Sequence, residues 1–306
     1  HRAAWPLPGP HRISFTPIVL LSISTATLYG TSPGRFCAMA AEAGFDGIEL
    51  VVGPRTPLRR AAHVAEQARR RGLAVLSVHE SLAAGRLRRR SPAALLAEAV
   101  ETALRAGAPR VVVHPPGTYA WEHPHAVGWL EALLRARDTH GAKVMLCVEN
   151  AGHYVAGDRQ RVLARLADQV MFCRQHGLRM TLDTCHVGTT GQPLMEAWQL
   201  AADLVGNLHL SDLRVAEPMV GSGLHRKLAH EHRFPGEGDL PLEGFLAAVH
   251  RQGYQGPVTT EVSIVGLGGW RPATWSTRLA ELAAWARHTT ERHPRETREP
   301  LSVKTE

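Results

Sequence analysis

Short apolar runs alternate with longer amphipathic segments along most of this chain. The runs carry apolar side chains at neighbouring positions, which is typical of parallel strands that are buried on both faces. The first of them follows Arg12 and could be misread as a signal peptide, but it falls in step with the later runs and predicts a strand. The predicted strands are Pro17–Ser24, Asp46–Val52, Ala74–Glu80, Arg110–Pro116, Lys143–Asn150, Arg179–His186, Leu204–Asp212 and Pro257–Ser263.

Segments rich in Ala, Leu and Arg separate these runs and repeat their apolar positions with the period of a helix. Clear examples are Leu58–Arg71, Pro92–Ala106, Arg159–His176 and Leu242–Gln252. A glycine stands at many helix-to-strand joins, where it accepts the left-handed conformation that ends a helix. These glycines are Gly44, Gly72, Gly107, Gly141, Gly177 and Gly253.

Eight βα units in about 250 residues predict a single closed (β/α)8 TIM barrel. We expect the barrel at residues 16–293, a flexible arm at 1–15 and a disordered tail at 294–306. An open doubly wound sheet is the rival, but it would place a glycine fingerprint after the first strand, and SISTATLYG is not one. The connection from Leu213 to Leu240 is unusually long, and long connections are often functional.

Composition narrows the class of protein. No window of about 18 uncharged apolar residues is present, so we expect no membrane span. The four cysteines show no paired short spacing, which favours reduced thiols and a cytoplasmic protein. The formal net charge of +7 comes mostly from arginines, for which a solvated helix face is favoured over a surface for phosphate or nucleic acid. They cluster at Arg59, Arg60, Arg69, Arg70 and Arg71, and at Arg86, Arg88, Arg89 and Arg90.

Carboxylates and imidazoles stand at or near the ends of seven predicted strands and in the long connection. In a barrel these ends form one rim, where chemistry takes place. One such residue alone is usually a hydrogen-bonded structural group or a helix cap. The whole set would repel or stay unsatisfied without a positive charge among its members, so it predicts a divalent cation: Mn, Zn, Co, Fe or Mg. The set is Glu49, His79, His114, Glu149, Asp183, His186, His209, Asp212, His230, His232 and Glu261.

The best ligand set is Glu149, Asp183, His209 and Glu261, because these residues come from four successive strands. The other histidines form two groups that could hold additional ions or bind substrate oxygens. His79 and His114 neighbour Glu149, while His186, His230 and His232 lie near the sixth and seventh strands. Asp212 is expected to hydrogen-bond a ligand or a loop amide.

The ordered motifs of this chain resemble the xylose isomerase-like barrel superfamily from residue 17 to about 290. That group includes sugar phosphate isomerases and epimerases, ketose 3-epimerases, inosose dehydratases and endonuclease IV. The motifs are FDGIEL, VVVHPPG, CVEN, LDTCH, HLSD, HRFPGEGDLPL and TTEVS.

Two branches of the superfamily imply different chemistry. Resemblance to the ketose epimerases implies one cation on the Glu, Asp, His, Glu set, with Glu149 and Glu261 as the catalytic proton carriers. Resemblance to endonuclease IV implies up to three zinc ions, which the additional histidines would help to hold. Three departures weaken the nuclease interpretation: His230 replaces an Asp, CVENAGH lacks a Thr, and ESLAA follows His79 in place of a Ser-Tyr-Leu stretch.

We therefore expect a metal-dependent sugar or sugar-phosphate isomerase or epimerase that transfers protons through a metal-stabilised enediolate. His186 and Arg214 are candidate substrate-binding residues, and Glu49 either binds substrate or stands behind the metal ligands. The alternatives are a zinc-dependent abasic-site endonuclease, a dehydratase or lyase, and a non-catalytic binding protein. The expected partner is a small sugar or polyol; nucleic acid is a weaker expectation, and a homo-oligomer is left open.

Overall fold

A computed structural model describes residues 19–28, 31–53, 58–80, 91–215, 230–269 and 271–292. The expected arm and tail lie outside these residues. So do the arginines at 86–90 and most of the long connection, residues 216–229.

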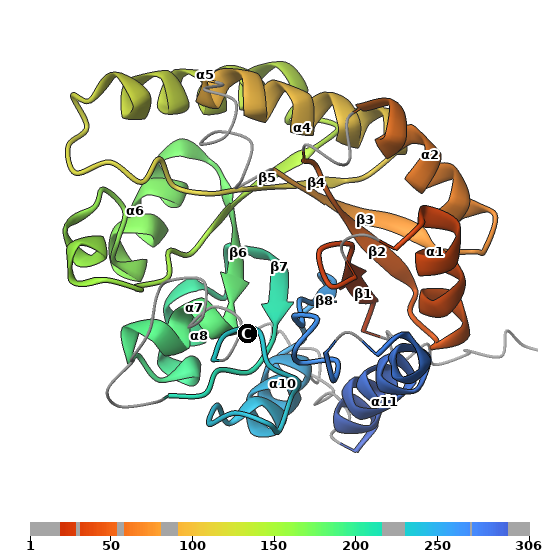
Figure 1. Ribbon diagram of the computed structural model, residues 1–306. Helices are drawn as coiled ribbons and strands as arrows, with labels where there is room; N and C mark the ends of the chain where they lie inside the picture. Colours follow the sequence, from red (N-terminus) through yellow and green to blue (C-terminus); the bar gives the residue numbers. More distant parts are fainter. Residues whose placement is uncertain are drawn as a thin grey trace, which may run out of the picture.

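Eight strands close into a barrel in the order of the sequence, and each is parallel to its neighbours (Figure 1). The closing pair joins β8 to β1. This confirms the single (β/α)8 TIM barrel. The strands are β1 (Leu21–Ser24), β2 (Gly47–Val51), β3 (Ala74–His79), β4 (Arg110–Val113), β5 (Met145–Glu149), β6 (Arg179–Asp183), β7 (Val205–Leu210) and β8 (Val258–Thr260).

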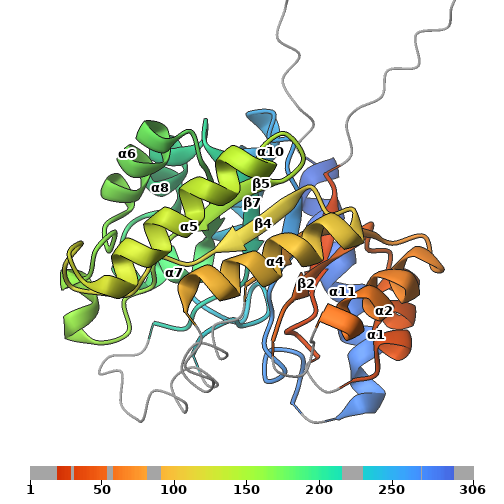
Figure 2. The ribbon, with the colours of Figure 1, turned by 90° about the horizontal axis from the view of Figure 1, so that it is seen from above.

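Helices surround the barrel, and α4 and α5 lie side by side across β4 (Figure 2). Their apolar faces pack on the outward-facing residues of the strands, so the strands are buried on both sides as expected. The helices are α1 (Pro33–Glu42), α2 (Leu58–Arg69), α4 (Pro92–Ala106), α5 (Pro124–His140), η1 (Ala156–Gln160), α6 (Leu166–His176), α7 (Thr184–Thr190), α8 (Leu194–Ala201), α10 (Leu242–Arg251) and α11 (Pro272–Glu291).

Several local predictions were wrong at their boundaries. The fourth strand ends at Val113 rather than Pro116, and the eighth ends at Thr260 rather than Ser263. The sixth strand ends at Asp183 rather than His186, because the Asp183 side chain accepts the His186 N–H and caps α7. The helix predicted from Arg159 begins at Leu166. Leu163 has a φ of 57°, which is incompatible with a right-handed α-helix through this position. Gly141 ends α5 with a φ of −58°, whereas Gly177 adopts the expected left-handed cap.

The solvated helix face expected for the arginines is present at the end of α2. Arg69 and Arg70 lie on an exposed helix face and both pair with Glu66. All four cysteines are buried and free. In the part of the chain that the structure describes, no helix combines the length and apolarity that a membrane crossing requires.

Candidate metal centre

His209 lies at the centre of the rim and faces carboxylates on both ring nitrogens. It is fully buried in β7 beside β6, where it is paired with Asp183 in the strand register. Its Nδ1 lies 2.8 Å from Glu149 Oε1, 3.1 Å from Glu261 Oε2 and 3.8 Å from Asp183 Oδ2. The structure thus brings the predicted ligand set to one point.

These four residues offer one nitrogen and three carboxylate oxygens, all within 4.8 Å of one another. Asp183 gives an independent sign that a ligand belongs here. Its Oδ1 accepts the His186 N–H, but its Oδ2 is buried and has no hydrogen-bond partner among the described residues. A buried carboxylate oxygen costs free energy unless a donor or a cation compensates it. An imidazole with three carboxylates suits Mn, Zn, Co or Fe, so the residues fit a divalent cation.

Glu149 connects this cluster to a second group. Its Oε2 lies 2.7 Å from His114 Nε2 and 3.5 Å from His79 Nε2, and these three residues also offer ligand atoms within 4.8 Å of one another. His79 donates its Nδ1–H to the Glu80 carbonyl at 2.6 Å, because a carbonyl can only accept. In its neutral form His79 therefore turns a lone pair on Nε2 toward Glu149.

Mutual attraction sets the charges of the cluster. Burial alone would lower the pKa of His114, but Glu149 and Glu80 together raise it to about 10. Burial likewise opposes the charge on His209, yet Glu49, Glu149 and Glu261 hold its pKa well above the usual range. Burial would raise the pKa of Glu149, but His114 and His209 hold it well below its ordinary value. Without a cation, protons on the histidines therefore balance the carboxylates.

Asn150 holds the ends of β5 and β6 in place. Its side chain accepts the Asp183 N–H at 2.6 Å and donates to the Asp183 carbonyl at 3.2 Å. Its own carbonyl accepts from His186 Nδ1 at 3.0 Å. Two candidate site residues thus take their orientation from a single asparagine.

Asp212 anchors the described part of the long connection. Its carboxylate accepts N–H groups from Leu213, Gly236, Gly238 and Leu240 at 2.8 to 3.0 Å. The expectation that Asp212 bonds loop amides is confirmed.

The other predicted site residues near the sixth and seventh strands range from nearly buried to exposed. His186 is 12% exposed beside the cluster, with Nδ1 at 3.8 Å from Glu149 Oε1. His232 packs edge-on to His186, and its φ of 48° is unusual for a residue other than glycine. Among the described residues, no group of close ligand atoms unites His186, His230 and His232. Arg214 is exposed and donates to the Glu237 carbonyl.

Glu49 is fully buried and points toward His209 from β2, with its Oε2 2.9 Å from His209 Nε2. Three residues of the site were not predicted from the sequence: Ser77 and Asn207, which donate to Glu49, and Asn150. Ser and Asn within strands carry no signal of their own. Only the direct adjacency of Asn150 to Glu149 could have indicated a role at the rim.

A cavity of about 1170 Å³ lies at the opposite end of the barrel, and its lining arginines Arg110 and Arg179 serve the backbone rather than a ligand. Arg110 Nε donates to the Gly206 carbonyl at 2.8 Å, and Arg179 Nη1 donates to the Asp203 carbonyl at 2.6 Å. These arginines complete the hydrogen bonding of β7 and of the segment that precedes it. Residues at this end of a barrel generally serve stability.

The model of the xylose isomerase-like TIM barrel family matches residues 37–288. The chain belongs to this family. An uncharacterized protein of Mycobacterium leprae is 29% identical over 269 residues, which cover 81% of this chain and 90% of that protein. An uncharacterized protein of Mycobacterium tuberculosis is 29% identical over 268 residues, with the same coverage of each chain.

Solved structures share the fold of this family member at low sequence identity. D-psicose 3-epimerase, solved in the presence of D-fructose, has a TM-score of 0.63 at 16% identity, covering 88% of this chain and 98% of that one. D-allulose 3-epimerase from Methylomonas, in complex with D-allulose, has a TM-score of 0.63 at 17% identity, covering 90% and 98%. The 3-keto-D-glucoside 4-epimerase of E. coli has a TM-score of 0.62 at 18% identity, covering 86% and 98%.

Proposed function

We propose that this protein is a metal-dependent isomerase or epimerase of a small sugar or sugar phosphate. One observation carries the proposal. Glu149 at the end of β5 and Glu261 just after β8 both place a carboxylate oxygen within 3.1 Å of His209 Nδ1. Two carboxylates at one point can take a proton from a carbon and return one. The structural relatives described as sugar 3-epimerases and a 4-epimerase support this substrate class.

The two glutamates differ in access to solvent. Glu261 has 18% of its side chain exposed, while Glu149 has 1%. When bound, a divalent cation supplies Lewis-acid polarisation of a carbonyl and stabilises the negative charge of an enediolate. One glutamate removes the proton from the carbon beside the carbonyl, and the other delivers a proton to the opposite face. The configuration of that carbon is thereby inverted.

His186 is the proposed contact for a substrate hydroxyl. Its Nδ1 donates to the Asn150 carbonyl, so the neutral ring offers the lone pair of Nε2 to an incoming O–H. Its partial exposure leaves it accessible from the mouth. Arg214, exposed at the start of the long connection, is the proposed contact for a more distant oxygen or phosphate.

Solvent exchange tests this proposal directly. The protein, reconstituted with Mn²⁺, Co²⁺ or Zn²⁺, is incubated in D₂O with D-fructose, D-allulose and D-tagatose and with their phosphates. We expect epimerised product that carries deuterium at the inverted carbon. Glu149→Gln and Glu261→Gln should each slow turnover by about 10²- to 10⁴-fold, because general acid–base catalysis contributes about that much.

The surface variant Glu101→Gln serves as control, since Glu101 pairs with Arg105 on an exposed face of α4, away from the cluster. Full turnover by a folded, metal-loaded Glu149→Gln protein would remove Glu149 from the reaction. Loss of water from the substrate in place of epimerisation would assign the protein to the dehydratases.

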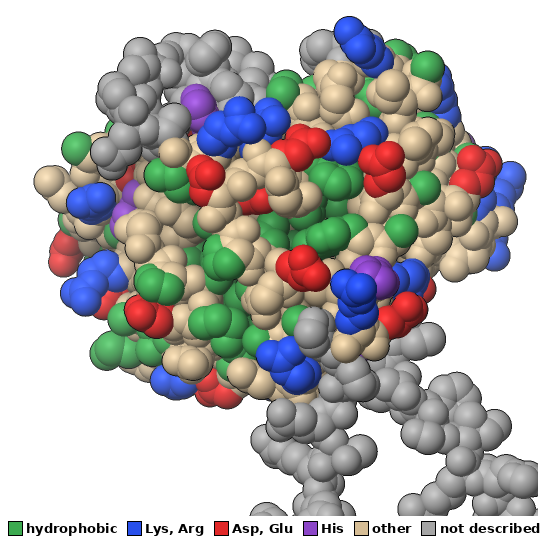
Figure 3. Space-filling model, turned by 90° about the horizontal axis from the view of Figure 1, so that it is seen from below, with side chains coloured by type: hydrophobic (Ala, Val, Ile, Leu, Met, Phe, Trp, Pro, Cys, Tyr) green, Lys and Arg blue, Asp and Glu red, His purple; other side chains and the backbone are tan. Residues whose placement is uncertain are grey.

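A second candidate function is hydrolysis of a phosphodiester at an abasic site. The group of His79, His114 and Glu149 favours it, because a further ion there would share Glu149 with the first. On the one face that Figure 3 shows, Lys and Arg side chains are interspersed with Asp and Glu and do not form a continuous basic patch. Incubation with an abasic-site duplex tests this candidate, and cleavage that falls steeply with salt would favour it.

A further inference from the structure

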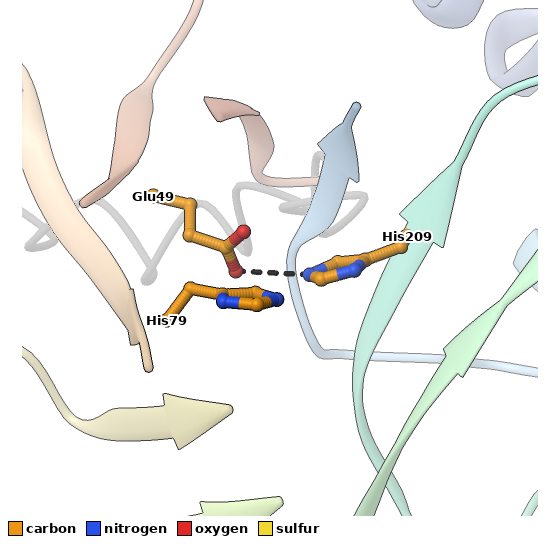
Figure 4. Close-up of side chains that lie close together, drawn as sticks. All are labelled: Glu49, His79 and His209. Atoms are coloured by element: carbon orange, nitrogen blue, oxygen red, sulfur yellow. Dashed lines mark hydrogen bonds and ion pairs between the residues drawn. The ribbon is translucent and has the colours of Figure 1, made fainter. Parts of the chain in front are cut away.

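Glu49 occupies a polar layer inside the barrel, directly beneath the candidate metal centre. Figure 4 shows its carboxylate pointing to the ring of His209, with the ring of His79 alongside. Three donors converge on Glu49 Oε2: His209 Nε2 at 2.9 Å, Ser77 Oγ at 2.8 Å and Asn207 Nδ2 at 3.3 Å. The side chain is fully buried, so these donors are what compensate its charge within the protein.

The contact with Glu49 bears on which ring nitrogen of His209 carries the proton. A neutral imidazole carries one N–H, and the nitrogen that keeps the proton cannot bind a cation. Carboxylates face both ring nitrogens, but a cation bound among Glu149, Glu261 and Asp183 would replace the proton on Nδ1. The single N–H of the neutral ring would then lie on Nε2, where Glu49 accepts it. The lone pair then lies on Nδ1, the nitrogen that faces Glu149, Glu261 and Asp183.

We infer that Glu49 is a positioning residue that fixes His209 as an Nδ1 ligand of the cation. The inference rests on the proposed function, because it assumes a cation in the four-residue cluster. A carboxylate behind a metal-binding histidine sets its tautomer, holds its ring and raises its basicity. Glu49 acts on the reaction through His209 and does not touch the substrate.

The rival explanation makes Glu49 a ligand itself. Glu49, His79 and His209 also offer ligand atoms within 4.8 Å of one another, and Glu49 Oε1 is buried with no hydrogen-bond partner in the described part of the chain. Against this, Oε2 is already surrounded by three donors, and an ion bound to His209 Nε2 would leave Asp183, Glu149 and Glu261 without their nitrogen. All three residues of the rival group are at least 97% buried, whereas Glu261 opens the four-residue cluster to solvent.

The first test measures Zn²⁺ binding to the full chain and to Glu49→Gln by calorimetry. Glutamine keeps the shape of the side chain, but its neutral amide can face His209 with either its oxygen or its NH₂, so the tautomer is no longer fixed. We expect affinity to fall by about 10- to 100-fold, the usual effect of removing such a partner, with the number of ions per chain unchanged. Glu101→Gln should match the wild type.

Unchanged affinity in a folded Glu49→Gln protein would overturn the inference, and so would the loss of a whole ion per chain, which would make Glu49 a ligand. Ser77→Ala is the graded control: it removes one donor from Glu49 but leaves the contact with His209, so the affinity should fall less than in Glu49→Gln.

A second measurement uses the wild type alone and stays decisive if Glu49→Gln fails to fold. In ¹⁵N-histidine-labelled protein saturated with Zn²⁺, NMR should show His209 protonated on Nε2 and bound through Nδ1. Binding through Nε2 would overturn the inference. If the wild type binds no divalent cation, the proposed function fails; if it binds one and Glu49→Gln binds it equally well, only the role of Glu49 fails.

Discussion

At the scale of single residues, His209 connects two layers of polar side chains inside the barrel. Its Nδ1 faces the three carboxylates of the rim and its Nε2 faces Glu49 beneath them. The surrounding negative charge raises its pKa even though burial opposes the charged form. A proton and a metal ion therefore compete for the same nitrogen.

This competition predicts the pH dependence of metal binding. Metal binding requires neutral imidazoles, while the metal-free protein holds protons on His209 and on His114, whose pKa is raised to about 10. Between about pH 6 and 9 these raised pKa values keep the protons on the metal-free protein, so a bound cation must displace them, and displacement becomes easier as the proton concentration falls. Affinity should then increase by up to about tenfold per pH unit for each proton released.

Calorimetry in buffers of different ionisation enthalpy counts the protons released on binding. An affinity that stays constant over this range, with no proton released, would contradict the charge state described here.

At the scale of elements, parallel strands that end at one rim gather residues that are distant in sequence. The rim residues could be predicted because a buried apolar run that stops at a carboxylate or imidazole is visible in the sequence, although several strands end up to three residues earlier than expected. The polar layer beneath could not be. Register shifts between β2 and β3 and between β6 and β7 set Glu49 opposite Ser77 and Thr181 opposite Asn207, and register depends on packing across the barrel.

The connection after β7 depends on Asp212. Asp212→Ala would leave four backbone N–H groups without their acceptor, at a cost of roughly 3 kcal/mol in the free energy of unfolding. Urea unfolding measures the loss, and hydrogen exchange at Gly236 and Gly238 should accelerate because both N–H groups lose their partner.

The matched control for this prediction is Asp239→Ala, whose carboxylate accepts one N–H within the described residues, that of the exposed Val215. Equal stability of the two variants, with exchange at Gly236 and Gly238 unchanged, would show that the anchor lies elsewhere.

At the scale of the whole molecule, the closed barrel places one group of candidate ligands, from β5 to the end of β8, at its mouth. Fold class and the four-residue set were both predicted from the sequence, because eight βα units constrain the topology and the rim follows from it. The grouping of the additional histidines was not settled by sequence: His79 and His114 join Glu149, whereas His186, His230 and His232 form no common ligand group among the described residues. That difference depends on side-chain direction, which strand periodicity alone does not fix.

Counting divalent ions tests the central claim most directly. After reconstitution with Mn²⁺, Co²⁺ or Zn²⁺ and removal of loosely bound metal, elemental analysis should find one tightly held ion per chain. The folded variant Asp183→Asn should lose that ion, because it removes the negative charge from the buried carboxylate whose Oδ2 has no hydrogen-bond partner among the described residues. A wild-type chain that retains no ion, or an Asp183→Asn chain that retains it as firmly as the wild type, would contradict a shared cation at the mouth of this barrel.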